Sequence, residues 1–265
     1  MPLSIVQSDF VDVNIPTIKT PTQQIFTTVG TSTWTRPTGC TKVKVTVIGG
    51  GGGAGGNFTK ANFNGHVGIN GAGGGGGTSI RLLDVSSIAS VEVTVGAGGN
   101  GGGSTSNGSA GGTSSFGTYA TANGGGGGNR CGTGTTVSYT DVATYGTLLG
   151  IPGAGGTAAD GDLNLRGEDG HLPARNHGSG PHDGGFSSGY SFQVTGPRGG
   201  QSAGLSAGNA RGTGGFSSQQ AAGGGSAGEA NTGNGGQSIA ANKTNYTATG
   251  AAGGSGIVIV DEFYS

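Results

Sequence analysis

Histidine and carboxylate side chains, the residue types best suited to metal binding or catalysis, gather in residues 160–183. His171, His177, His182 and Asp183 could supply ligands to a metal if their side chains converged in space. Most of them lie in "HGSGPHDGG", which is polar and rich in glycine. This composition favours a solvated loop, so we predict that the chain binds neither a metal nor another cofactor.

The acidic residues of the same stretch raise the question of polysaccharide cleavage. That reaction needs a pair of positioned carboxylates. Asp160, Asp162, Glu168 and Asp169 form the only acidic cluster, and nothing in their spacing sets two of them opposite each other. A hydrated loop explains the cluster as well, and we predict that the protein is not an enzyme.

Composition restricts the remaining kinds of chemistry. The fingerprint G-x-G-x-x-G occurs at Gly96, Gly98 and Gly101, but no βαβ unit follows, and 66 of the 265 residues are glycine, so chance explains the match. A net charge of −1 without a basic run excludes nucleic acid as an expected partner. No stretch approaches the roughly 18 apolar residues of a membrane span, and the N-terminus lacks the pattern of a signal peptide. Cys40 and Cys131 are expected to be free thiols, and a disulfide between them is the alternative.

The glycines that surround these residues have a period of three. Gly65, Gly68, Gly71, Gly74 and Gly77 fall on every third residue, and similar runs recur near residues 96–111 and 250–256. Three residues per turn is the geometry of polyproline II. Collagen is excluded because the runs are short and the chain has only eight prolines. We therefore predict short left-handed rods that pack side by side through backbone hydrogen bonds.

Short strands precede or follow these glycine runs. Alternating side chains predict strands at 42–48, near 79–85 and at 91–95, and the apolar run at 257–264 predicts a strand that is buried on both faces. "IFTTVGTSTWTRP" has the pattern of a β-hairpin, with Phe26 and Trp34 as its apolar anchors.

The predicted fold class is all-β and irregular: short antiparallel strands in a sandwich-like core, joined to packed glycine-rich rods, with almost no α-helix. Residues 1–24, rich in Pro and Thr, are expected to form an arm for attachment or oligomerisation. Residues 25–265 are expected to form one glycine-rich domain with loops at its distal end.

The strand-to-glycine junctions also carry a resemblance. "FTTVGTSTWTRPTGCTKVKVTVIGGGGGAGG", "VEVTVGAGGNGG" and the closing "GGSGIVIVDEFYS" resemble the glycine-rich domain of bacteriophage tail fibres and tail-tip adhesins. The resemblance implies a protein of the distal tail of a virion, made in the host cytoplasm, which attaches the phage to a bacterial surface receptor (an outer-membrane protein or lipopolysaccharide). It also implies contact with other tail proteins through the arm, or a homotrimer that the arm holds together, and no membrane insertion. The alternatives are an ice-binding protein or a structural glycine-rich protein.

Receptor contact is expected where glycine thins out and larger polar or aromatic side chains appear, on loops held by the scaffold. Four inserts have this composition: 57–66, 129–149, 160–193 and 211–220. The third is the first choice, and its candidate residues are Arg166, His171, Arg175, His177, His182, Phe186, Tyr190 and Phe192. The second choices are Phe58, Phe63, Tyr139 and Tyr145.

Overall fold

The structure, a computed structural model, is all-β. It describes residues 19–58, 67–130, 147–171, 175–176, 192–195, 199–202, 213–216, 225–238, 240–241 and 247–264. These residues contain strands and turns but no α-helix. The all-β prediction is confirmed, and the strands predicted near 42–48, 79–85, 91–95 and 257–264 are all present.

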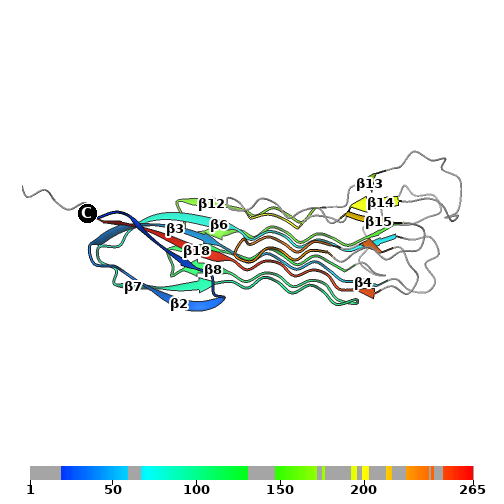
Figure 1. Ribbon diagram of the computed structural model, residues 1–265, viewed down its shortest axis with the longest axis horizontal. Helices are drawn as coiled ribbons and strands as arrows, with labels where there is room; N and C mark the ends of the chain where they lie inside the picture. Colours follow the sequence, from blue (N-terminus) through cyan, green and yellow to red (C-terminus); the bar gives the residue numbers. More distant parts are fainter. Residues whose placement is uncertain are drawn as a thin grey trace, which may run out of the picture.

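Two antiparallel five-stranded sheets form a sandwich at one end of the molecule (Figure 1). Sheet A consists, in order, of β1 (Thr22–Phe26), β18 (Ile257–Tyr264), β3 (Cys40–Ile48), β6 (Thr78–Asp84) and β12 (Leu163–Leu165). Sheet B consists of β11 (Ala158–Ala159), β9 (Ala120–Ala122), β8 (Ser114–Phe116), β7 (Ser90–Val95) and β2 (Gly30–Thr35).

Strict alternation of side chains builds the hydrophobic core between the sheets. Val43, Val45 and Val47 of β3 are buried, while the alternating Lys42 and Lys44 are exposed. From sheet B, the Trp34 and Phe116 rings meet with centroids 5.6 Å apart. Successive residues of a strand point to opposite faces, and branched side chains suit a half-buried sheet, so the period-two pattern of the sequence is sufficient to produce this core.

The predicted hairpin and the predicted burial of the last strand need correction. β1 pairs with β18 in sheet A, whereas β2 pairs with β7 in sheet B, so the two strands lie in different sheets. Phe26 and Trp34 do pack in the core, but they reach it from opposite sheets. β18 is buried mainly on one face: Val258 and Val260 are buried, whereas Phe263 is exposed, because sheet A has its core on one side only.

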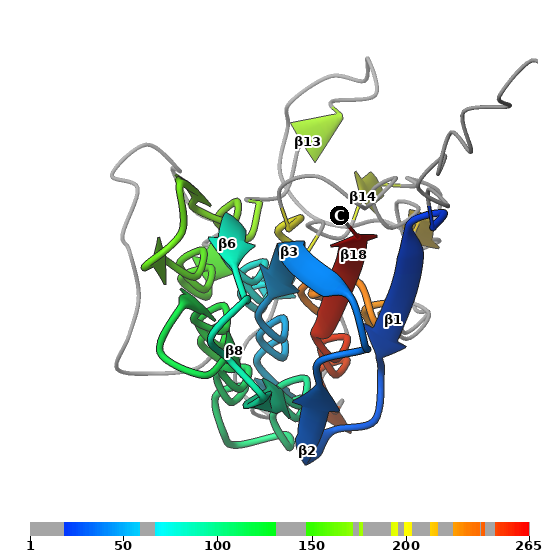
Figure 2. The same ribbon diagram turned by 90° about the vertical axis from the view of Figure 1, so that its left-hand side faces the viewer.

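Glycine-rich segments continue from eight strands of the sandwich and lie side by side (Figures 1 and 2). Their backbone hydrogen bonds repeat every third residue. In segment 49–56, the first, fourth and seventh N–H groups donate to 71–77, the second, fifth and eighth to 106–112, and the third and sixth to 250–254. The N···O distances are 2.8–3.0 Å. A segment whose every third N–H meets the same neighbour has three residues per turn, which is the period of the glycines in the sequence.

Two of these segments form an interior made almost entirely of backbone. Segment 49–56 also accepts hydrogen bonds from segments 96–102, 125–128 and residue 236, so that six segments surround it. Segment 71–77 is enclosed in the same way, and every residue of both segments is buried. We call this assembly of segments the glycine bundle. Because its buried N–H and C=O groups pair with one another, it satisfies the requirement that buried backbone groups find partners.

Close approach explains why these segments are glycine. A Cβ added at Gly51 would lie 2.0 Å from the carbonyl oxygen of Asn234, and one at Gly74 would lie 2.1 Å from that of Ala154. Real Cβ atoms essentially never come closer than 3.0 Å to such an atom. The bundle therefore excludes larger residues at these positions.

Both ends of the described chain lie at the sandwich end. Thr22 of β1 pairs with Glu262 of β18, and the Lys19 ammonium lies 3.9 Å from the centroid of the Tyr264 ring. The boundary expected after residue 24 falls inside β1, so the part of the chain that precedes the sheet ends at about Pro21.

A buried carboxylate connects three strands at this end. Glu262 is 1% exposed, and its Oε1 accepts hydrogen bonds from Trp34 Nε1 (2.9 Å) and Gln24 Nε2 (2.7 Å). Its Oε2 accepts hydrogen bonds from the hydroxyl groups of Thr22 and Tyr264. A buried charge needs such partners, because an unpaired one is costly.

Candidate functional site

Small sheets gather the flanks of the predicted loops at the end of the molecule opposite the sandwich (Figure 1). One contains β10 (Thr147–Leu149), β5 (Val67–Ile69) and β16 (Ala240–Ala241). Another contains β13 (Arg175–Asn176), β14 (Phe192–Thr195) and β15 (Thr213–Phe216), and the last pairs β17 (Thr247–Ala248) with β4 (Asn57–Phe58). Segments far apart in sequence thus meet at one place, which we call the distal end.

The distal end includes flanks of all four predicted inserts. β4 begins the insert 57–66, β10 ends the insert 129–149, and β14 and β15 bring the inserts 160–193 and 211–220 side by side. In this last pair, Phe192 is in register with Phe216. Each of the four inserts thus has at least one described flank at the distal end.

The individual candidate residues fall into three groups. Arg166 and His171 are described with their side chains, and both are exposed. Arg175, Phe192 and Phe58 belong to β13, β14 and β4. The remaining candidates lie outside the described residues: Phe63, Tyr139, Tyr145, His177, His182, Phe186 and Tyr190.

The insert 160–193 is not one loop. Its first residues turn between β11 and β12 at the sandwich end, where Asp162 Oδ2 accepts the N–H of Leu82 (2.8 Å) and the backbone oxygen of Asp160 accepts a hydrogen bond from Arg81. Its middle, 166–170, is a segment of the glycine bundle. Of its later described residues, those of β13 and Phe192 of β14 lie at the distal end (Figure 1). The acidic cluster is divided accordingly: Asp160 and Asp162 lie in the turn between β11 and β12, whereas Glu168 and Asp169 lie in the bundle segment.

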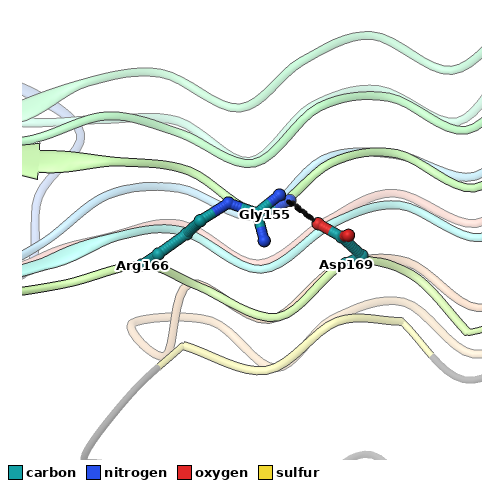
Figure 3. A network of polar contacts seen from close by, with 3 residues as sticks. All are labelled: Gly155, Arg166 and Asp169. Carbon is teal, nitrogen blue, oxygen red and sulfur yellow. Dashed lines mark hydrogen bonds and ion pairs between the residues drawn. The ribbon is translucent and has the colours of Figure 1, made fainter.

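Arg166 and Asp169 have a structural role on the flank of the bundle (Figure 3). Asp169 Oδ1 accepts the N–H of Gly155 at 2.7 Å and also pairs with the Arg166 guanidinium. The hydrogen bond from Gly155, followed by the contacts with Arg166, lowers the pKa of Asp169 below its ordinary value of 3.8, although partial burial acts in the opposite direction. The carboxylate thus takes the place of the backbone carbonyl that an interior N–H would find on a neighbouring segment.

Glu168 and His171 add a second ion pair to this flank. His171 Nε2 lies 3.5 Å from Glu168 Oε2, and both side chains are about half exposed. An exposed pair of this kind contributes little to stability. These residues supply polar groups to the surface of the bundle, between the sandwich and the distal end.

One part of the distal end was missed by the sequence analysis. The turn between segments 96–103 and 106–112 exposes Thr105, Ser106 and Asn107. The turn is held in place because Gly56 donates its N–H to the backbone oxygen of Ser106 (3.0 Å), and Asn107 Oδ1 accepts the N–H of Arg130 (2.9 Å). The hydroxyl and amide groups that interrupt the period here were the available signal.

Metal binding, membrane insertion and cysteine chemistry find no support in the described residues. No group of three or more His, Cys, Asp or Glu side chains in the described residues is placed to hold a metal ion. Within the same part of the chain, no helix has the length and hydrophobicity needed to cross a membrane. Cys40 is a buried free thiol, and burial together with the nearby Glu262 carboxylate raises its pKa; Cys131 lies outside the described residues. A buried thiol with a raised pKa is a poor nucleophile.

Comparison with known proteins agrees with this geometry. The family described as a glycine-rich domain matches residues 27–262, which include the glycine bundle and all of the sandwich except β1 and the last residues of β18. No curated protein matches the chain. Because the match covers most of the 265 residues, the chain belongs to the glycine-rich domain family.

Proposed function

We propose that this protein is a receptor-binding adhesin at the tip of a bacteriophage tail or tail fibre. The observation that carries the proposal is the separation of the two ends: the described N-terminal residues lie at the sandwich, whereas the flanks of the glycine-poor inserts meet at the distal end (Figure 1). In this proposal, the sandwich end joins the particle and the distal end contacts a component of the bacterial surface.

The glycine bundle suits the part between the two ends. Its interior is a network of backbone hydrogen bonds at 2.6–3.1 Å, so that there are few interior side chains to rearrange. Most of its length carries glycine, alanine and serine, which offer few groups with which to discriminate a partner. Recognition would therefore fall to the distal end, where loops on a rigid scaffold commonly carry function.

The distal end carries chemistry that suits a glycan or a polar protein loop. Thr105, Ser106 and Asn107 present hydroxyl and amide groups on a turn that is fixed by the bundle. Three predicted contact residues belong to strands of the distal end: Arg175 to β13, Phe192 to β14 and Phe58 to β4. Aromatic and arginine side chains are the usual anchors of recognition surfaces. The proposed receptor is an outer-membrane protein or lipopolysaccharide.

Binding of the fluorescently labelled protein to a panel of bacterial strains, including mutants that lack single outer-membrane proteins or lipopolysaccharide sugars, tests the proposal. Binding is expected to be saturable on some strains and lost in a mutant of one surface component. Replacing residues 177–191 by a short Gly-Ser bridge is expected to abolish it, while a substitution at the sandwich end, Ser87→Tyr, leaves it unchanged.

Absence of binding across the panel, or equal loss in both variants, would contradict the proposal. A thermal-hysteresis measurement on the same sample tests the ice-binding alternative. No feature of the described residues favours that alternative. The melting temperature of each variant serves as the control for folding.

A further inference from the structure

The outer face of sheet A, which points away from the core, carries a row of four apolar side chains and one threonine that crosses all five strands. Strand pairing places Ile25, Ile259, Thr46, Ile80 and Leu163 side by side. Directly paired residues of antiparallel strands project from the same face. The row is therefore continuous from β1 at one edge to β12 at the other, and we call it the sheet A face, together with the neighbouring Leu82 and Phe263.

This face is exposed to an extent that the rest of the described surface is not. Leu82 is 59% exposed, Ile25 54% and Leu163 48%, and Phe263 is also exposed. These four are among only six large apolar residues that are exposed in the described part of the chain. Single apolar residues on a surface are ordinary, but a contiguous set of them marks a surface that binds something.

The polar groups at the centre of the face are paired with one another, and the charged Lys42 and Asp84 lie at its end, next to Phe263. The Lys44 ammonium lies 3.7 Å from Asp261 Oδ2, and Gln23 donates to the other oxygen of the same carboxylate at 2.6 Å. The face therefore carries no uncompensated charge at its centre. An apolar, weakly charged polypeptide fits it better than a charged ligand.

We propose that the sheet A face is the docking surface for residues 1–18 of the same chain, which lie outside the described residues. The position of Lys19 is the first argument. Its Nζ donates to the backbone oxygen of Thr38 at 3.4 Å and lies over the Tyr264 ring. Residues 1–18 are therefore joined to the described chain at the corner of sheet A where β1 begins and β18 ends. Phe263, next to Tyr264, is the nearest member of the face.

The sequence of the segment is the second argument. In "FVDVNI", residues 10–15, Val11, Val13 and Ile15 alternate with Asp12 and Asn14. In an extended conformation this places the three apolar side chains on one side. Residues 1–18 also contain Met1, Leu3, Ile5, Val6, Phe10 and Ile18, an unusually apolar content for a chain that is only 31% hydrophobic.

The reach is sufficient. Ile15 precedes Lys19 by four positions, which allows about 13 Å at roughly 3.3 Å per residue. The row itself is further away, because Ile25 follows Lys19 by six positions, or about 20 Å of extended chain, so an extended segment reaches the row from about Val13 onward. The five strands of sheet A span about 19 Å from first to last, and a strand of about six residues covers that distance. The residues up to Val13 can therefore lie across the row, and Ile15 can contact the part of the face between the row and Lys19. This proposal is independent of the receptor-binding proposal, since it concerns the opposite end of the molecule.

Site-specific photo-crosslinking in the full-length protein tests the docking. A benzophenone side chain in place of Leu82 is expected to crosslink to residues 1–18 within one chain, whereas the same group in place of Thr33, exposed on sheet B, is expected not to. The crosslinked peptides are identified by mass spectrometry, and the crosslinked species is expected to run as a monomer. Because Leu82 is more than half exposed, its replacement should leave the fold intact, which circular dichroism checks.

A matched pair of substitutions makes the test specific. Val13→Asp would place a charge against the apolar face and is expected to reduce the crosslink yield from position 82 by about tenfold. Asn14→Asp adds the same charge on the opposite side of the segment and is expected to leave the yield nearly unchanged. The proposal is overturned if position 82 gives no crosslink to residues 1–18, if it crosslinks only to a second chain, or if both substitutions act equally.

Discussion

Gly74→Ala tests the central physical claim, that the glycine bundle depends on contacts too close for a Cβ. The added Cβ would lie 2.1 Å from the oxygen of Ala154, against a practical limit of 3.0 Å, so the two backbones must separate by about 0.9 Å. The Ala154 oxygen accepts the N–H of Gly126, and Gly74 itself donates to Gly126 (2.9 Å) and accepts from Gly52 (2.8 Å). A hydrogen bond stretched by this much is effectively lost.

The magnitude follows from these bonds. A buried backbone group left without a partner costs about 1–3 kcal/mol, so losing two bonds costs about 2–6 kcal/mol. Replacing glycine by alanine also stabilises by about 0.4–1 kcal/mol, because the unfolded chain loses conformational freedom. The expected net loss is about 2–5 kcal/mol, a large part of the roughly 5–15 kcal/mol that keeps a typical domain folded.

Gly103→Ala is the matched control. Gly103 belongs to the same bundle, but it is exposed, and an added Cβ would meet nothing closer than a side-chain oxygen of Ser106 at 3.5 Å. Only the gain from the unfolded state then operates, and stability is expected to be unchanged or slightly higher. Gly126→Ala, with its nearest contact at 3.0 Å, is expected to fall between the two.

Urea denaturation with linear extrapolation measures the free energies of unfolding, and the buried Trp34, the only tryptophan, supplies the fluorescence signal. Amide hydrogen exchange reports on the bundle itself. If Gly74→Ala and Gly103→Ala differ by less than about 0.5 kcal/mol, which is the usual range for surface substitutions, close backbone packing does not hold the bundle together.

Three further predictions concern the sandwich end and the bundle flank. Glu262→Ala should destabilise the protein by about 2–3 kcal/mol in urea denaturation, because Trp34 Nε1 loses its partner in the core, while Glu262→Gln keeps an acceptor and should cost less. Asp169 has a lowered pKa in the folded state, so its stabilising effect is present above pH 3.8 and is lost as the pH falls further. In thermal melts, Asp169→Asn should therefore lose less stability in that acid range than the unchanged protein. An identical acid profile would refute the role of Asp169. Deleting residues 1–18 should leave the melting temperature within a few degrees of its original value, whereas deleting 1–24 should lower it further, because that cut removes half of β1 and two partners of Glu262.

Much of the sandwich could be predicted from the sequence, because local alternation determines which residues face the core. Alternation predicted the strands around Val45 and Val93, and a continuous apolar run predicted the strand around Val260. The partners of β1 and β2 could not be, since a three-residue connection between two strands is equally typical of a hairpin. Tertiary contacts decide the pairing. β18 has a free edge on which β1 pairs, and Thr22 and Gln24 donate hydrogen bonds to the buried Glu262.

The candidate site was predicted less completely, for a similar reason. Glycine-poor stretches include the places where the chain leaves the bundle, but composition does not say at which end of the bundle it does so, and one of them, 160–193, also contains the bundle segment 166–170. Asp160 and Arg175 occur in one such stretch, yet the first turns at the sandwich and the second belongs to a strand at the distal end. Conversely, Thr105 replaces only one glycine of the period, and the turn that contains it was not predicted.

The sandwich explains how a bundle made of backbone acquires a unique alignment. Two glycine segments that bond every third residue can slide by three residues and form the same hydrogen bonds again, and glycine has no side chain that would resist the shift. A strand does resist, because a slip moves its apolar residues out of the core. Eight of the segments continue directly from strands of the sandwich, so the packing of Trp34, Phe116 and the valines fixes the position of each segment along the bundle. The large apolar side chains of the described residues are therefore concentrated in the core that sets the register of the segments. Because each segment continues from a strand, the same core also sets the register at the distal end of the bundle.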